Sequence, residues 1–310
     1  MKVSIIGGGG RVGADAAFAL QLGGIVKEIA LVDANADAAH GEALDLRHGA
    51  ALTSAQVFTS SGSYEIVDGS DCVVITAGLR RRPDESRLDL INRNVGLFKS
   101  ILDSVKGCSL PETATILVVS NPVDILTHMA AHAEILPPSQ VIGLGTVLDT
   151  SRFRSLIADH IKVAATDVKA LILGEHGDSM VPIWSCATVS GVPLTSIPGF
   201  HAGVAEELFK KTQTSGAEVI RQKGGAGRAV GISIKEVVEA MALDQGKILP
   251  VSAVQNGAMG ISDISLSLPT RVGSRGVVDI FEPAVSDKEK ELLLKSAESL
   301  KATWALVQGQ

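Results

Sequence analysis

A single imidazole in a short segment between two glycines is the first candidate for chemistry in this sequence. The apolar residues 171–173 lead into Gly174-Glu175-His176-Gly177. The apolar run predicts a buried strand, so the charged pair is expected in the turn that ends it. Histidine has the proton affinity nearest neutrality and therefore suits proton transfer. A lone histidine in a turn is more often structural, so the assignment depends on the groups that the rest of the chain supplies.

A second candidate is an acid and a base three residues apart. Asp149 and Arg152 belong to the segment 145–154, which opens a helix that runs to about His160. Residues at this spacing project from neighbouring points of one helix face. Such a pair is normally a surface ion pair that contributes little.

Four arginines follow the segment Thr76-Ala-Gly78: Arg80, Arg81, Arg82 and Arg87. Most charge clusters of this kind are solvated. Guanidinium groups, however, pair with carboxylates in a bidentate manner and stay charged at working pH. These arginines therefore favour an anionic substrate. A loop at this place is expected to close over the substrate when it binds.

The elements that must position these residues begin with a strand, a glycine turn and a helix. The apolar residues 3–6 run into Gly7-Gly-Gly-Gly-Arg11-Val12-Gly13, and helix-forming residues follow. Two registers fit, Gly8-x-Gly10-x-x-Gly13 and Gly7-x-x-Gly10-x-x-Gly13. Glycines permit a tight turn and close backbone approach, and the helix N-terminus then presents free N–H groups to a pyrophosphate. No Gly-Lys-Ser/Thr follows, which argues against a triphosphate loop.

An acidic residue ends the next apolar run. Asp33 follows residues 29–32 and lies 20 residues after Gly13. A carboxylate at this position accepts hydrogen bonds from ribose hydroxyls and repels a 2′-phosphate. The prediction is a dinucleotide site that prefers NAD to NADP.

Apolar runs and helix-permissive segments alternate through the first half. Further strands are expected at 56–58, 72–76, 115–119 and 141–143. Short apolar strands between helices predict a doubly wound parallel sheet covered on both faces. Ligands bind beyond the carboxyl ends of such strands. This places Thr76, Ala77 and Gly78, and the segment Ser120-Asn121-Pro122, at the cofactor.

Length and composition limit the number of domains and the kinds of partner that the chain can have. The chain has 310 residues and a formal net charge of −6, so we expect two domains, 1–144 and 145–310, and no nucleic-acid partner. Three isolated cysteines give neither a disulfide framework nor a zinc site. No apolar run is long enough to span a membrane. We expect a cytoplasmic protein without a metal.

The second half is expected to contain both helices and strands. Helices are predicted at 204–221 and 233–243, and strands at 247–254 and 261–268, with 271–281 continuing the sheet. The last helix begins at Ser286 with Glu289 three residues on, which is a capping box.

Taken together, the chain resembles the lactate/malate dehydrogenase family over nearly its whole length. The matching motifs are the glycine turn with Asp33, 76–78, 85–90, 119–122, 145–152 and 174–179. The resemblance implies a Rossmann domain followed by an α+β catalytic domain, with NAD as cofactor and a homodimer or homotetramer as the assembly.

The resemblance also implies residue roles. His176 would be the acid/base, Asp149 would orient it, and Arg87 would polarise the reacting carbonyl. Arg152 would clamp the substrate carboxylate, and Asn121 would bond substrate or nicotinamide. Asn94 and Val119 would lie near the cofactor. Arg154 and Lys169 fall where some bacterial lactate enzymes bind an anionic effector.

Substrate choice is expected to depend on two positions. The residue six before the polarising arginine is usually Gln in lactate enzymes and Arg in malate enzymes, and here it is Arg81. Ala226 is small, as in malate enzymes. Three other features look more like lactate enzymes: Glu85, the segment 145–154, and the end of the histidine segment at Trp184. We predict a malate dehydrogenase that takes a small dicarboxylate. L-lactate dehydrogenase and a non-catalytic NAD(H) sensor are the alternatives.

Overall fold

A computed structural model describes residues 1–79 and 84–308. Its centre is an eight-stranded sheet. Six of the strands come from the first half: β1 (Lys2–Ile6), β2 (Glu28–Val32), β3 (Phe58–Ser61), β4 (Cys72–Ile75), β5 (Thr115–Val118) and β6 (Val141–Gly143). Two come from the second half: β11 (Ser252–Asn256) and β12 (Ser262–Ser267). The spatial order is β12-β11-β6-β5-β4-β1-β2-β3.

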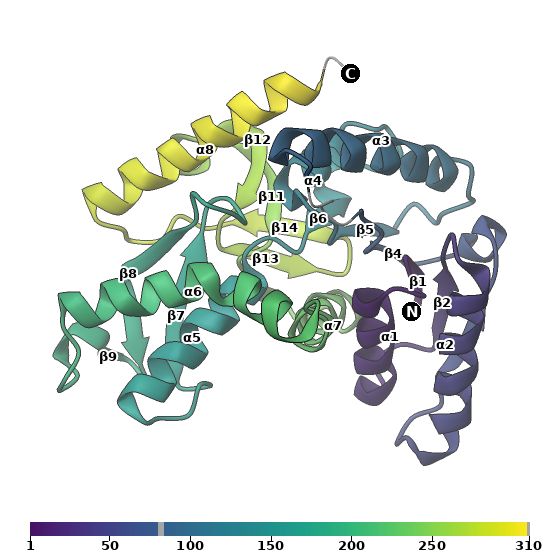
Figure 1. The fold of residues 1–310 in the computed structure, drawn as a ribbon, viewed down its shortest axis with the longest axis horizontal. Helices are drawn as coiled ribbons and strands as arrows, with labels where there is room; N and C mark the ends of the chain where they lie inside the picture. Colours follow the sequence, from purple (N-terminus) through teal and green to yellow (C-terminus); the bar gives the residue numbers. More distant parts are fainter. Residues whose placement is uncertain (80–83, 309–310) are drawn as a thin grey trace.

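Helices cover both faces of this sheet (Figure 1). They are α1 (Arg11–Gly23), α2 (Ala36–Gly49), α3 (Arg87–Lys106), α4 (Val123–Ala131), α7 (Arg228–Ala242) and α8 (Asp287–Val307). Alternate residues of each strand point to opposite faces. Val73 and Ile75 of β4 join the core beneath α3, α4 and α8. Cys72 and Val74 join the core beneath α1, α2 and α7. Burial on both faces explains why these strands are continuously apolar.

The strand order reverses between β1 and β4. From β1 the chain builds outward through β2 and β3, and from β4 in the opposite direction through β5 and β6, all in parallel. The loops after β1 and β4 therefore diverge at the carboxyl end of the sheet, which is where sheets of this kind bind ligands. The predicted doubly wound fold is confirmed.

The sheet is not wholly parallel, and this differs from the prediction. β11 pairs with β6 on one side and with β12 on the other, both in antiparallel fashion. Pro250 and Val251 divide the predicted strand 247–254 into β10 (Lys247–Leu249) and β11. The third strand also starts later, at Phe58 instead of Gln56. Since the second half extends the sheet of the first, the boundary at residue 144 remains a prediction.

The rest of the second half forms two smaller sheets. β7 (Val168–Leu173), β8 (Val181–Val189) and β9 (Val192–Pro193) pack with α5 (Val147–Ile161) and α6 (Ala202–Lys223) around a core of their own. β10, β13 (Thr270–Gly273) and β14 (Gly276–Ile280) form the other sheet, so 271–281 does not continue the main sheet. The predicted capping box is present at Ser286 and Glu289.

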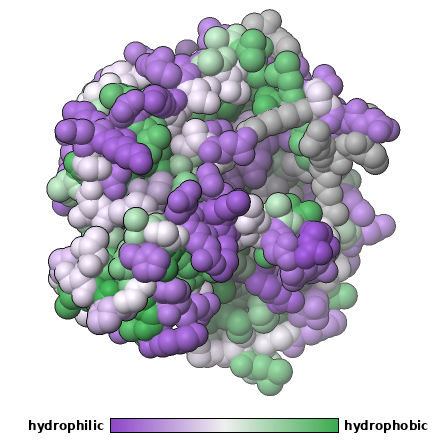
Figure 2. Space-filling view, turned by 60° about the vertical axis from the view of Figure 1, so that its left-hand side comes forward, coloured by the Kyte–Doolittle hydropathy of each residue, from purple (hydrophilic) through white to green (hydrophobic). Residues whose placement is uncertain are grey.

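On the face shown in Figure 2, apolar residues, in green, lie in scattered groups among hydrophilic residues, in purple. Within residues 1–79 and 84–308, no helix combines the length and the apolar character needed to cross a bilayer.

Candidate active site

The glycine segment forms a tight turn between β1 and α1. Gly7 directly follows β1 and has φ of +91°, which is a conformation that favours glycine. Gly10 is the N-cap of α1. A Cβ on Gly13 would lie 2.2 Å from the Gly7 carbonyl oxygen, so only glycine lets the helix approach the turn this closely. The turn at Gly7 favours the Gly7-x-x-Gly10-x-x-Gly13 register, although Gly8 is also tightly packed, against Leu31.

Side chains from two neighbouring strand ends fix this turn. Asp33, after β2, accepts hydrogen bonds from the Gly9 N–H (3.0 Å) and the Asn35 N–H (2.9 Å). The Thr76 hydroxyl, after β4, contacts the carbonyl oxygens of Ile6 and Gly7 at 3.1 and 3.2 Å. Asp33 and Thr76, which the sequence placed at the cofactor, therefore both hold the backbone of the glycine turn.

The N-terminus of α1 suits a dinucleotide. It has no capping side chain and no acidic residue in its first turn, so its amide groups are available to an anion. Val12 packs on the core beneath the turn. The residues at this end of the sheet fit the pyrophosphate and ribose of NAD.

Arg11 makes contacts that the sequence did not predict. Its Nη1 donates hydrogen bonds to the carbonyl oxygens of Lys223 (2.8 Å) and Gly225 (2.9 Å). The side chain thus ties α1 to the segment that contains Ala226. Arg11 was predicted as a cofactor contact, and in this structure its guanidinium binds the protein backbone.

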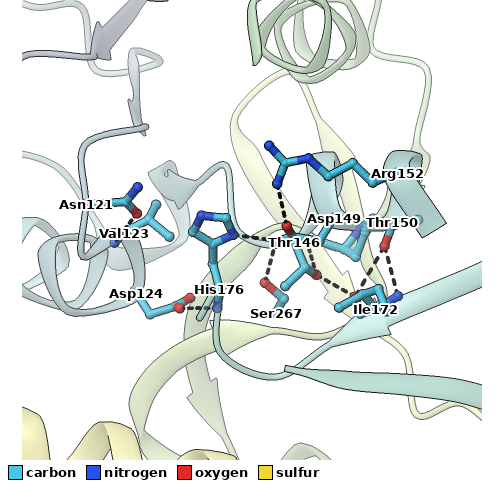
Figure 3. A network of polar contacts seen from close by, with 11 residues as sticks. Asn121, Val123, Asp124, Thr146, Asp149, Thr150, Arg152, Ile172, His176 and Ser267 are labelled. Atoms are coloured by element: carbon cyan, nitrogen blue, oxygen red, sulfur yellow. Dashed lines mark hydrogen bonds and ion pairs between the residues drawn. The ribbon is translucent and has the colours of Figure 1, made fainter. Parts of the chain in front are cut away.

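His176 is held in the turn between β7 and β8 by two carboxylates (Figure 3). Its Nδ1 lies 2.5 Å from Asp149 Oδ2, so Nδ1–H donates to Asp149 and the acid/base atom of the ring is Nε2. Its backbone N–H donates to Asp124 Oδ2 at 2.7 Å. The imidazole comes from residues 171–177 and its partner from α5, as the sequence predicted.

The charges around the imidazole set its proton affinity. Burial alone would lower the pKa of His176, but the charge and hydrogen bond of Asp149 outweigh burial and raise the pKa above its ordinary value. Burial would raise the pKa of Asp149, but His176 and Arg152 hold it below the ordinary range. The pair therefore favours an imidazolium beside a carboxylate.

Arg152 shares the same carboxylate. Its Nη1 lies 3.0 Å from Asp149 Oδ1, and the Asp149 side chain is only 1% exposed. The carboxylate of this i,i+3 pair is thus buried and its guanidinium partly buried, unlike the surface pair that this spacing usually gives. On α6, Gly216 faces the guanidinium, because a Cβ there would lie 3.6 Å from Arg152 Nη1.

Asp124 is the functional residue that the sequence analysis missed. It lies in α4, where every residue is buried, and burial raises its pKa to about 6. The neighbouring Ser252 opposes that rise, as do the hydrogen bond from the His176 N–H and the charge of His176. The available signal was a carboxylate in a largely apolar helix, three residues after Asn121. Such a residue is not buried without a partner.

Hydroxyl groups connect α5 to β7 behind the site (Figure 3). The Thr146 hydroxyl donates to the Ile172 carbonyl at 2.5 Å, and the Thr146 N–H donates to Ser267 Oγ at 3.0 Å. The Ile172 N–H donates to Thr150 Oγ1 at 3.0 Å. These contacts fix Asp149, on α5, relative to the strand that leads to His176.

Other predicted residues follow β5 or lie on α3. Asn121 is exposed after Val119, at the end of β5, and is joined to Pro122 by a cis peptide bond. Asn94 is buried, and its Oδ1 accepts from the Leu79 N–H at 2.7 Å. It therefore holds the segment that follows Gly78.

Two predicted arginines are described incompletely. Arg81 lies outside the described residues, as does the arginine loop from 80 to 83. The backbone of Arg87 begins α3, with Ser86 as N-cap, and its side chain is outside the description. At the predicted effector position, Arg154 Nε donates to the Ala170 carbonyl at 2.9 Å, and Lys169 is exposed.

Comparisons with known proteins agree with this geometry. The family model for the lactate/malate dehydrogenase NAD-binding domain matches residues 1–143. The model for the alpha/beta C-terminal domain of the same family matches residues 146–308. The chain belongs to the lactate/malate dehydrogenase family. As a member, it is an NAD-dependent oxidoreductase.

Several relatives in this family are named L-lactate dehydrogenase. The chain is 42% identical over 305 residues to L-lactate dehydrogenase 1 of Clostridium acetobutylicum, covering 97% of this chain and 96% of the relative. It is 39% identical over 305 residues to the L-lactate dehydrogenase of Acetivibrio thermocellus, covering 97% and 95%. The structure of a minor L-lactate dehydrogenase from Enterococcus mundtii, in a ligand-bound form, aligns with a TM-score of 0.95 at 36% identity, over 100% of this chain and 99% of that one.

These relatives overturn the malate prediction. It weighed Arg81 and Ala226 above the resemblances that Glu85, the segment 145–154 and Trp184 bear to lactate enzymes. Proteins about 40% identical over almost the full length are named L-lactate dehydrogenase. The substrate pocket is built by many residues together, so two positions do not determine its choice. The expected dicarboxylate substrate was wrong, and with it the assignment of Arg81 to a second carboxylate.

Proposed function

We propose that this chain interconverts L-lactate and pyruvate with NAD as the hydride carrier. The observation that carries the proposal is His176 on Asp149, with Arg152 on the same carboxylate. A proton donor and a carboxylate-binding cation are thereby placed side by side. The names of the full-length relatives support lactate and pyruvate as the substrate pair.

In this proposal His176 carries the proton. The bound nicotinamide supplies or accepts the hydride. In the reducing direction the His176 imidazolium donates its Nε2 proton to the carbonyl oxygen of pyruvate. In the oxidising direction the neutral ring takes the hydroxyl proton of lactate. Asp149 fixes the tautomer through Nδ1–H and favours the imidazolium.

Arg152 is proposed to bind the carboxylate of the substrate. Asp149 engages its Nη1, and the other nitrogens of the guanidinium can form a bidentate pair with a carboxylate. Arg87, at the start of α3, is proposed to polarise the reacting carbonyl, and Asn121 to bond the same oxygen or the nicotinamide. Arg81 and Ala226 are proposed to border the substrate.

Cofactor contacts are proposed along the strand ends. Gly7, Gly8, Gly10, Arg11, Val12 and Gly13 would bind the pyrophosphate through their backbone, and Asp33 the ribose. The other proposed contacts follow β4 and β5 or lie on α3: Thr76, Ala77, Gly78, Asn94, Val119 and Asn121.

A homo-oligomer is part of the proposal. Large apolar side chains are exposed on α1 and on the adjacent α7: Phe18 is 46%, Leu22 55% and Ile232 62% exposed. Apolar groups gathered on packed helices are typical of an association surface. Light scattering on the purified chain should give a dimer or tetramer mass, and a monomer at micromolar concentration would exclude the assembly.

Loss of the imidazole tests the catalytic assignment. His176→Asn should lower kcat for pyruvate reduction by about 10²–10⁴, because the proton donor is gone. NADH affinity, measured by fluorescence titration, should stay within a few-fold of that of the unaltered chain, since His176 lies apart from the glycine turn. Tight NADH binding with no reduction of any 2-keto acid by the unaltered chain would support the sensor alternative.

A further inference from the structure

The C-terminal helix α8 contacts the turn that carries His176. Figure 1 shows α8, in yellow, beside β8 and β12. Ser296, in the middle of α8, is completely buried. Its Oγ accepts a hydrogen bond from the Glu175 N–H at 2.9 Å, across 121 residues of sequence. A Cβ on Gly174 would lie 2.7 Å from this oxygen, so the hydroxyl is seated directly against the turn.

Three residues form a closed ring of hydrogen bonds at this contact. Ser179 Oγ donates to Glu175 Oε2 at 2.5 Å, and Ser179 Oγ lies 3.0 Å from Ser296 Oγ. Because Ser179 already donates its hydroxyl proton to the carboxylate, Ser296 must donate to Ser179. The ring therefore runs from the Glu175 N–H through Ser296 and Ser179 back to the Glu175 carboxylate, with every donor matched to an acceptor.

The ring complements the contact made by α4. Ser296 holds the amide of Glu175, and Asp124 holds the next amide, that of His176. Gly174, one residue earlier, is bonded through its backbone to Ser267 of β12. Three consecutive residues of the turn are thus fixed by three different elements. Of these, α8 also contacts Ser179, which follows His176 in the chain.

We propose that Ser296 is a positioning residue for His176, through which α8 sets the placement of the imidazole against Asp149. The proposal rests on the proposed function for its effect on turnover. A displacement of a reacting group by about 1 Å can cost on the order of 10²-fold in rate. Without the Ser296 hydroxyl, the Glu175–Ser179 turn loses its anchor on α8, and the His176–Asp149 hydrogen bond lengthens.

The test compares Ser296→Ala with Ser299→Ala. Ser299 is exposed on the same helix, so its substitution controls for changes in α8 itself. Ser296→Ala should lower kcat for pyruvate reduction roughly tenfold, with KM and NADH affinity changed less than about threefold. Ser299→Ala should match the unaltered chain in all three.

A readout without substrate separates this inference from the proposed function. The pKa of His176 in the free protein can be followed by NMR titration, with the resonance assigned by its loss in His176→Asn. Ser296→Ala should lower this pKa towards the ordinary histidine value, because the contact with Asp149 that raises it is weakened. An unchanged pKa in a folded Ser296→Ala protein would overturn the positioning role whatever the turnover. A lowered pKa without pyruvate reduction by the unaltered chain would retain it and reject the function.

Ser179→Ala breaks the same ring while leaving α8 unaltered. If the ring acts as a unit, the double variant Ser179→Ala/Ser296→Ala should lose about as much kcat as either single variant. Fully multiplicative losses would show two independent effects and contradict the ring. Since Ser179 is in the turn and not in a core, this variant also serves if Ser296→Ala fails to fold.

Discussion

The imidazole of His176 lies between two carboxylates that act on different atoms. Asp149 binds the ring through Nδ1 and raises its pKa, whereas Asp124 binds the backbone amide. Asp149 contributes most to the raised pKa of the ring. The charge of Asp124 adds to it, while its contact with the backbone amide fixes the turn.

The Asp149 contact predicts a change in pH dependence. Reduction needs protonated His176, so kcat/KM for pyruvate should be constant at low pH and fall as pH rises through the raised pKa of His176. Asp149→Asn removes the negative charge, lowers that pKa and moves the falling limb to lower pH. A pH–rate profile of both proteins measures this. An unmoved limb would show that another group donates the proton.

The same shift links protonation to stability. Because the pKa of His176 is raised in the folded chain, its contribution is fully present below the unfolded-state pKa and is lost as pH rises through the folded-state value. In the window between the two values, urea unfolding should show stability falling with pH, and the fall should be smaller in Asp149→Asn.

At the scale of elements, close contact between α1 and α7 joins the cofactor turn to the second half of the chain. A Cβ on Gly231 of α7 would lie 2.6 Å from the backbone of Asp15. Arg11 bonds the carbonyls just before α7, and Asp15 pairs with Arg228 at 3.3 Å. The segment with Ala226 is therefore fixed to the helix that begins at the glycine turn.

This packing gives a matched pair of substitutions. Gly231→Ala should destabilise the chain by about 1–3 kcal/mol, since the added methyl meets backbone that cannot yield easily. Gly96→Ala, in α3, meets nothing within 4 Å and should stabilise by up to about 1 kcal/mol, through helix propensity. Thermal or urea unfolding compares the two. Equal effects would mean that the two helices are not in close contact.

The sequence predicted the elements better than their pairing. Apolar runs and glycines located β1, β2, β4 and the turn at Gly7 because each signal is local. The antiparallel addition of β11 and β12 to the sheet was not predicted, because pairing partners more than 100 residues apart leave no local pattern. Asp124 was missed for the same reason: its partner amide is 52 residues away.

At the scale of the whole molecule, the two halves contribute different parts of one site. The first half supplies the glycine turn, Asp33, Asn121 and Asp124, and the second supplies Asp149, Arg152 and His176. The sequence identified the reaction class from these residues without Asp124. Its malate prediction was wrong, because it weighed Arg81 and Ala226 above the lactate-like features, whereas full-length relatives are named L-lactate dehydrogenase.

The central claim is tested most directly by measuring kcat/KM for pyruvate and oxaloacetate side by side, with NADH in excess. The account predicts efficient reduction of pyruvate and a higher kcat/KM for pyruvate than for oxaloacetate. A higher value for oxaloacetate, or no reduction of pyruvate by a chain that binds NADH, would contradict it.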